Sequence, residues 1–172
     1  SKDGINFSEK KVLLRNTDFP ADMSLHVRDP KVWEEDGVYY MVLGARTTDD
    51  KGFILLYKSN DLYNWEFHSV PAGKLDDMGY MWECPDTFKL SDKDVLMFSP
   101  QGMEAEGYKY NNVYQCGYAV GNFLNDKKEL KLGEFVEIDR GFDFYAPQTF
   151  EDSKGRRIVI GWMGVPDAVE HK

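Results

Sequence analysis

The apolar residues of this chain come in short runs and do not follow the spacing of an amphipathic helix. Each run is rich in aromatic and β-branched residues and is bounded by Gly, Asp, Asn or Lys, which is typical of strands. The runs lie at residues 38–45, 53–59, 94–100, 113–120 and 156–163. Charged segments with the composition of hairpin turns lie at 34–37, 49–52, 90–94 and 151–155. The pattern predicts an all-β chain.

A weak internal repeat organises these strands. Segments 28–45, 83–101 and 145–163 share a polar or aromatic residue before a proline, a short strand, a charged turn and a strongly apolar strand. In the first two units, two further strands follow, the last of them near residues 64–70 and 133–138, whereas the third unit stops after its second strand. Four antiparallel strands per unit predict the blades of a β-propeller.

The chain has too few repeat units to close a propeller ring by itself. The repeat supplies about two and a half to three blades, whereas a closed ring needs about four to eight. We therefore expect an arc of a larger ring, with exposed blade faces that would favour self-association. A compact sandwich of ~10 strands is the alternative, and it explains the strands but not the repeated prolines.

Charge and composition exclude several classes of partner. The net charge of −9 argues against nucleic acid, which requires a basic surface. The short basic clusters at 127–131 and 154–157 are expected to be solvated turns. No apolar run approaches the ~20 residues of a membrane helix, so no membrane partner is expected. The first residues lack the apolar stretch of a signal peptide, which favours a cytoplasmic location over secretion.

Cysteine and histidine usage gives no support to a metal site. Cys84 and Cys116 fit free thiols or one bridge, and their apolar surroundings favour free, buried thiols. His26, His68 and His171 are far apart and have no metal-ligand spacing. We therefore expect no metal and no cofactor. The aromatic content of 15% suits a sheet core or a sugar-stacking surface.

The repeat brings acidic residues to one place. In a propeller, residues near the start of each innermost strand converge on the central channel, and Asp29 and Glu83 occupy that step of the first two units. The third unit offers Asp143 and Tyr145 just before its proline. Carboxyl groups packed together keep one member protonated near neutral pH, because like charges repel. Glycoside hydrolysis requires one such acid and a second, ionised carboxylate.

Each candidate also has a structural explanation. An Asp before Pro is commonly a turn device, although the adjacent Arg28 favours a role for Asp29, because an axial ion pair is costly unless it is used. Glu83 lies between Trp82 and Cys84 in an apolar segment, where an unused carboxyl group would be unfavourable. Three aromatic side chains could stack on sugars but are more often core residues: Tyr80, Trp82 and Trp162.

Five segments in order resemble glycoside hydrolase family 32, the β-fructosidases. They are RDPKVW, SNDLYNWEF, MWECPDTF, DRGFDFYAPQTF and GWMG, and they span most of the chain. The RDP and ECP signatures are short, but their joint order with FYAPQ is specific. The resemblance implies a five-bladed β-propeller, normally followed by a β-sandwich, and a retaining mechanism at fructofuranosides such as sucrose, sucrose 6-phosphate or fructans.

The same resemblance implies roles for individual residues. Glu83 of ECP would be the general acid/base, and Asp29 of RDP would stabilise the transition state. Arg28 would bind sugar and orient the acidic pair, while Asp143 and Tyr145 would line the substrate pocket.

The chain also departs from the family pattern. The family's nucleophile lies in a motif of the type Trp-Met-Asn-Asp-Pro-Asn-Gly, and residues 1–172 contain no such motif. We therefore expect residues 1–172 to be an internal fragment of one propeller domain, without the first blade or the sandwich, and to be inactive alone. Two alternatives stay open: a non-catalytic sugar-binding propeller and a fructosyltransferase.

Overall fold

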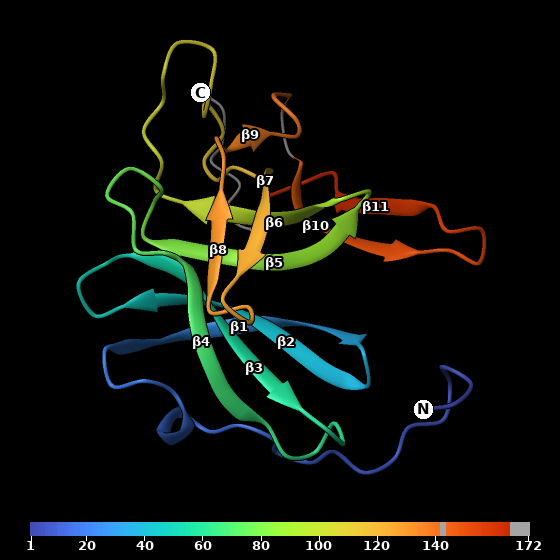
Figure 1. Cartoon of the computed structure of the whole chain (residues 1–172). Coiled ribbons are helices and arrows are strands. Elements are labelled where there is room, and N and C mark those ends of the chain that lie inside the picture. Colours follow the sequence, from blue (N-terminus) through green and yellow to red (C-terminus); the bar gives the residue numbers. More distant parts are fainter. Residues whose placement is uncertain (142–143, 166–172) are drawn as a thin grey trace.

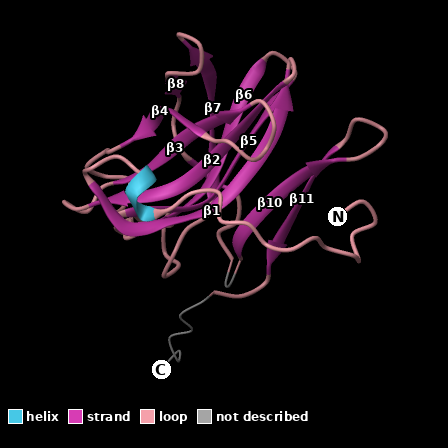
Figure 2. Cartoon of the chain, turned by 90° about the horizontal axis from the view of Figure 1, so that it is seen from below, coloured by secondary structure: helices cyan, strands magenta, loops and turns pink. Residues whose placement is uncertain are grey.

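The fold is known from a computed structural model, which describes residues 1–141 and 144–165. Within this part of the chain the structure is strands and loops, with one short 3-10 helix at Asn16–Asp18 (Figure 2). No helix in the described residues is long and apolar enough to cross a membrane. The expectation of an all-β chain is therefore confirmed.

The strands form three antiparallel sheets that follow one another along the sequence (Figure 1). The first sheet has the order β1(Met23–Glu35), β2(Val38–Thr47), β3(Gly52–Ser59), β4(Glu66–Gly73). The second has the order β5(Met81–Leu90), β6(Lys93–Gln101), β7(Gly117–Leu124), β8(Glu129–Leu132), with β9(Val136–Glu137) also paired to β7. The third contains β10(Tyr145–Glu151) and β11(Arg157–Trp162). Two successive sheets, each with four neighbouring antiparallel strands in sequence order, confirm the propeller arrangement over the sandwich, while the count of five blades stays a prediction.

Two expected strands are shorter than predicted, and one strand was not expected. The strand expected at 113–120 begins only at Gly117, and the strand expected at 133–138 is present only as β9, which pairs with β7. The sequence did not predict β8, which lies before it and also pairs with β7. The chain turns back directly after Leu124, because Asn125, Asp126 and Lys127 all adopt positive φ values. Asn and Asp tolerate this conformation, so a tight turn brings residues 129–132 beside β7.

Alternating side chains give the first sheet two apolar faces. One face packs with the second sheet in a core that includes Val42, Ile54, Leu56, Trp82 and Phe98. The opposite face carries Met41, Leu43, Ala45, Phe53, Leu55 and Tyr57. Gly44 allows the close approach of the sheets, since a Cβ there would lie 2.0 Å from the Trp82 carbonyl oxygen. Trp82 is thus a core residue, 1% exposed, and not a sugar-stacking platform.

The three repeat prolines mark one backbone feature. Pro30, Pro85 and Pro147 lie in the first strand of each sheet, β1, β5 and β10, and the pairing register shifts around each of them. The residue before each proline has a positive φ: 59° at Asp29, 49° at Cys84 and 51° at Ala146. These bulges bend the three inner strands at equivalent positions.

The third sheet is less covered than the first two. Its strands leave apolar side chains open to solvent, including Ile160 at 62% and Trp162 at 52% exposure. This agrees with the expected exposure of a blade face. Self-association through that face stays a prediction.

Candidate active site

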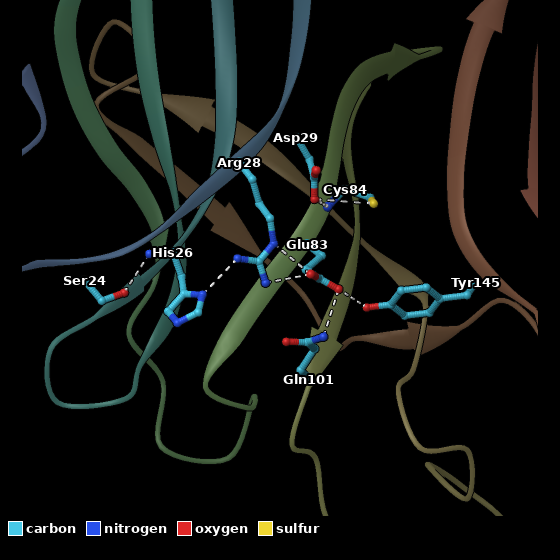
Figure 3. Close-up of polar contacts among 8 residues, drawn as sticks. All are labelled: Ser24, His26, Arg28, Asp29, Glu83, Cys84, Gln101 and Tyr145. Atoms are coloured by element: carbon cyan, nitrogen blue, oxygen red, sulfur yellow. Dashed lines mark hydrogen bonds and ion pairs between the residues drawn. The ribbon is translucent and has the colours of Figure 1, made fainter. Parts of the chain in front are cut away.

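The carboxyl group of Glu83 is the centre of the site. It lies on β5, with its side chain 14% exposed. Its Oε1 accepts from Arg28 Nε at 2.8 Å and lies 2.7 Å from Arg28 Nη2. Its Oε2 accepts from Gln101 Nε2 at 3.0 Å and from the hydroxyl of Tyr145. The donors come from β1, β6 and β10, so all three sheets meet at this carboxyl group (Figure 3).

The repeat explains this meeting. Arg28, Glu83 and Tyr145 each precede their proline by two residues and lie immediately before the bulge of an inner strand. Asp29 is therefore equivalent to Cys84, one step later than Glu83. The sequence predicted that Asp29 and Glu83 occupy the same or adjacent positions of their repeat units. In the structure Asp29 lies on β1, and its side chain contacts the residue that follows Glu83 on β5.

Asp29 is held by the residue that follows Glu83. Its Oδ2 accepts from the backbone N–H of Cys84 at 3.0 Å, and the Cys84 Sγ lies 3.6 Å from the same oxygen. Burial, followed by the charges of Asp29 and Glu83, raises the pKa of the Cys84 thiol to about 12. The thiol therefore keeps its proton at neutral pH and can donate to Asp29. Both cysteines are free, as expected; Cys116 is buried and Cys84 only partly so.

Tyr145 donates to Glu83 from β10 of the third sheet. The residue is 3% exposed, and burial, followed by its hydrogen bond to Glu83, raises its pKa well above the ordinary value. Its hydroxyl group is therefore a donor throughout the neutral and alkaline range. Tyr145 thus contacts the central carboxyl group, while its expected role in lining the substrate pocket stays a prediction. Asp143, the other candidate of this segment, lies outside the described residues.

Two polar contacts of the site were not anticipated from the sequence. Gln101 pairs with Met81 across the hairpin, which places it diagonally opposite Glu83. His26 precedes Arg28 by two residues, and its Nδ1 lies 3.2 Å from Arg28 Nη1 (Figure 3). Strand alternation gives residues i and i+2 the same face, so this second contact could have been found from the sequence.

The site carries no cluster typical of a metal centre. Across residues 1–141 and 144–165, no three His, Cys, Asp or Glu side chains are arranged to hold a metal ion. The polar groups around Glu83 are instead hydrogen-bond donors aimed at one carboxyl group, with a second carboxyl group beside it. Two carboxyl groups in separate environments, at the axis of a propeller, define a site of the glycoside hydrolase class.

Comparison with known proteins agrees with this class. The model of the glycosyl hydrolases family 32 N-terminal domain matches residues 1–172, and the chain belongs to this family. Among curated relatives, the sucrose-6-phosphate hydrolase of Bacillus subtilis (strain 168) is 53% identical over 99% of this chain and 36% of its own length. The raffinose invertase of Escherichia coli is 43% identical over 98% of this chain and 34% of its own length. The chain thus spans about a third of these relatives.

Solved structures agree with the fold. The GH32 beta-fructofuranosidase of Bombyx mori has a TM-score of 0.87 and 41% identity, over 98% of this chain and 36% of that chain. A mutant of that enzyme in complex with sucrose has a TM-score of 0.82 and 43% identity, over 88% and 32% of the two chains.

Proposed function

We propose that the full-length protein is a retaining β-fructofuranosidase that hydrolyses sucrose or sucrose 6-phosphate. The observation that carries the proposal is the Glu83 carboxyl group, which receives hydrogen bonds from three sheets beside Asp29. Membership of family 32 supports the reaction class. Relatives named for hydrolysis of sucrose 6-phosphate and for raffinose cleavage support a β-fructofuranoside as the substrate.

Glu83 acts as general acid and then as general base in this proposal. It protonates the glycosidic oxygen of the leaving sugar and later takes a proton from the water that releases fructose. Sugar hydroxyl groups that bind Arg28 would draw it away from Oε1, which leaves that oxygen free to carry the proton. Tyr145 and Gln101 keep the other oxygen in place during both steps.

Asp29 acts on the charge of the transition state. Positive charge develops at the anomeric carbon as the glycosidic bond breaks, and an ionised carboxylate beside the fructose ring stabilises it. The Cys84 N–H fixes the direction of this carboxylate before the substrate binds. A retaining mechanism also requires a nucleophile, and in this proposal the nucleophile is a residue other than Asp29 and Glu83.

The test uses the full-length protein, sucrose and an activated aryl β-fructofuranoside. Glu83→Gln is expected to lower kcat/KM for sucrose by about 10³-fold, because an amide cannot protonate the leaving oxygen. The first step with the aryl substrate needs no such proton, so its loss is expected to be much smaller. Glu35→Gln is the matched control, since Glu35 also pairs with a cation, Lys127, but lies at the far end of β1.

The products separate this proposal from the two alternatives. Hydrolysis releases glucose and fructose in equal amounts, whereas a transferase at high sucrose accumulates fructosyl oligosaccharides and an excess of glucose. Binding of sucrose without any turnover would favour a non-catalytic sugar-binding propeller. Equal losses on both substrates in Glu83→Gln would contradict the role of Glu83 as the acid.

A further inference from the structure

A second layer of polar residues lies directly behind the carboxyl groups of the site. It consists of the residues that follow the three repeat prolines: Lys31, Asp86 and Gln148. Lys31 Nζ donates to Asp86 Oδ2 at 3.0 Å, to Gln148 Oε1 at 3.5 Å and to the backbone carbonyl of Thr149. One lysine of the first sheet therefore contacts both other sheets.

The carboxyl group of Asp86 is fully buried, so it must be paired within the protein. Asp86 is 0% exposed, and its Oδ2 also accepts from the backbone N–H of Thr149 at 2.6 Å. Its Oδ1 is buried and has no hydrogen-bond partner in the part of the chain that the structure describes. A buried carboxylate is costly unless it is paired, so Lys31 and Thr149 must stay close to Asp86. This requirement ties β1, β5 and β10 together at the axis.

The layer reaches the site through the backbone of Cys84. Gln148 Nε2 donates to the Cys84 carbonyl oxygen at 3.0 Å, and the Cys84 N–H donates to Asp29 Oδ2 at 3.0 Å. Cys84 has a φ of 49°, and it precedes a proline. A non-glycine residue in this left-handed region is strained and persists only where its surroundings hold it. Here Gln148 holds the carbonyl side and Asp29 the amide side.

We propose that Gln148, supported by Lys31, is a positioning residue for both carboxyl groups of the site. By fixing the strained Cys84 backbone, it keeps the N–H aimed at Asp29 and the adjacent Glu83 aimed at Arg28. This inference rests on the proposed function of Asp29 and Glu83. Among the described residues, Gln148 has no hydrogen bond to either carboxyl group, so it acts through Cys84 on the transition state rather than on substrate binding.

The test compares Gln148→Met and Gln148→Glu in the full-length protein with sucrose as substrate. Both side chains keep the length of Gln148, but neither donates to the Cys84 carbonyl at neutral pH; the Glu variant retains the acceptor for Lys31. We expect kcat to fall about tenfold in both, with KM changed less than about twofold, because the loss is one of transition-state stabilisation. Unfolding midpoints are measured alongside.

Gln115→Met is the matched control. Gln115 is also buried, and its Nε2 also donates to backbone carbonyls, those of Tyr110 and Asn112. We expect its kcat to stay within about twofold of the wild type even where the unfolding midpoint falls.

Each outcome decides the inference. The inference would be overturned if Gln148→Met kept the kcat of the wild type, with or without a rise in KM. It would also be overturned if Gln148→Glu kept the full kcat. An equal fall of kcat in Gln115→Met would also overturn it, since general loosening would then explain the effect. If the wild type does not turn over sucrose, or Glu83→Gln leaves turnover unchanged, the proposed function fails and this inference fails with it. Active wild type, inactive Glu83→Gln and fully active Gln148→Met would reject the positioning role alone.

Discussion

Among the ion pairs that join the first two sheets, one near the site and one far from it differ in consequence. At the axis, Arg28 Nη2 lies 2.7 Å from Glu83 Oε1. At the rim, Lys127 Nζ lies 2.9 Å from Glu35 Oε2, at the other end of the same strand β1. The two ion pairs have similar N···O distances but differ in how many groups surround each charge. At the axis several donors converge on one carboxyl group, whereas at the rim one lysine is shared among neighbours.

The surroundings of each pair explain the difference. The Lys127 ammonium lies 5.2 Å from the Tyr40 ring and 5.5 Å from the Phe123 ring, and its backbone carbonyl accepts from Ser69. This lysine docks the turn of the second sheet onto the first. The axial carboxyl group of Glu83 instead receives hydrogen bonds from side chains of all three sheets. Backbone strain does not separate the two places, since Lys127 at the rim has a φ of 59°, as Asp29 does at the axis. An ion pair therefore indicates a catalytic site only when donors from several elements converge on it.

The largest effect outside Glu83 is expected for Asp29→Asn. Asparagine keeps the shape and the hydrogen bond from Cys84 but loses the negative charge, so kcat for sucrose is expected to fall about 10²- to 10³-fold. KM is expected to change little, since the charge acts mainly in the transition state. Steady-state kinetics of the full-length variant check this. A rise in KM at constant kcat would make Asp29 a ground-state binding residue.

A smaller effect is expected for Tyr145→Phe. Loss of a hydrogen bond to a charged group costs about 1.5–3 kcal/mol, so kcat is expected to fall about ten- to a hundredfold. The pKa of Tyr145 lies above its ordinary value, so the hydroxyl stays protonated and keeps donating to Glu83 as the pH rises. The ratio of wild-type to variant kcat should therefore be flat from pH 6 to about 9.5. A ratio that declines towards alkaline pH would show that Tyr145 ionises.

The smallest effect is expected at the rim, from Glu35→Gln. Burial works to raise the pKa of Glu35, but its hydrogen bond and charge interaction with Lys127 outweigh burial and hold the pKa below 4.5. The ionised form is thus favoured in the fold, and the pair stabilises the protein above that pH. Because the Glu35 side chain is 38% exposed, we expect the pair to contribute at most about 1 kcal/mol to the free energy of unfolding at pH 7, and we expect no change in kcat.

The pH dependence of unfolding checks the rim prediction. As the pH falls through the folded pKa, Glu35 takes up a proton and the contribution of the pair disappears. Urea unfolding should therefore separate wild type and Glu35→Gln at pH 7, and the difference should disappear as the pH falls through the folded pKa of Glu35. A difference that persists at the lower pH would assign the effect to packing instead of charge.

Much of the fold could be predicted from the sequence because it depends on local patterns. Short apolar runs bounded by turn residues defined β2, β3, β6 and β11 within a few residues, and the repeated prolines marked the first strand of each sheet. The same pattern found β9 but missed β8, which is the strand next to β7 in the second sheet. The left-handed turn at 125–127 decided that position, and its neighbours along the chain gave no periodic signal for it.

The basic clusters are only in part the solvated turns that the sequence predicted. In the cluster at 127–131, Lys128, Glu129 and Lys131 are exposed, but Lys127 is only 16% exposed and residues 129–131 belong to β8. In the cluster at 154–157, Arg157 lies 4.8 Å from the Phe88 ring of the second sheet and pairs with Glu151. A charged side chain is buried or exposed according to what another sheet brings beside it. That information is not present in a short segment.

The sequence by itself determined that the chain is built of strands, that it repeats, and that Asp29 and Glu83 lie close together. Apolar runs and the proline of each repeat occupy only a few residues, so they can be recognised locally. Only the tertiary structure decided which groups hold those carboxyl groups. Arg28 and Tyr145 lie 55 and 62 residues from Glu83 in sequence. Their meeting depends on the register within each sheet and the packing of one sheet on the next, because a shift of one residue would turn each side chain to the opposite face.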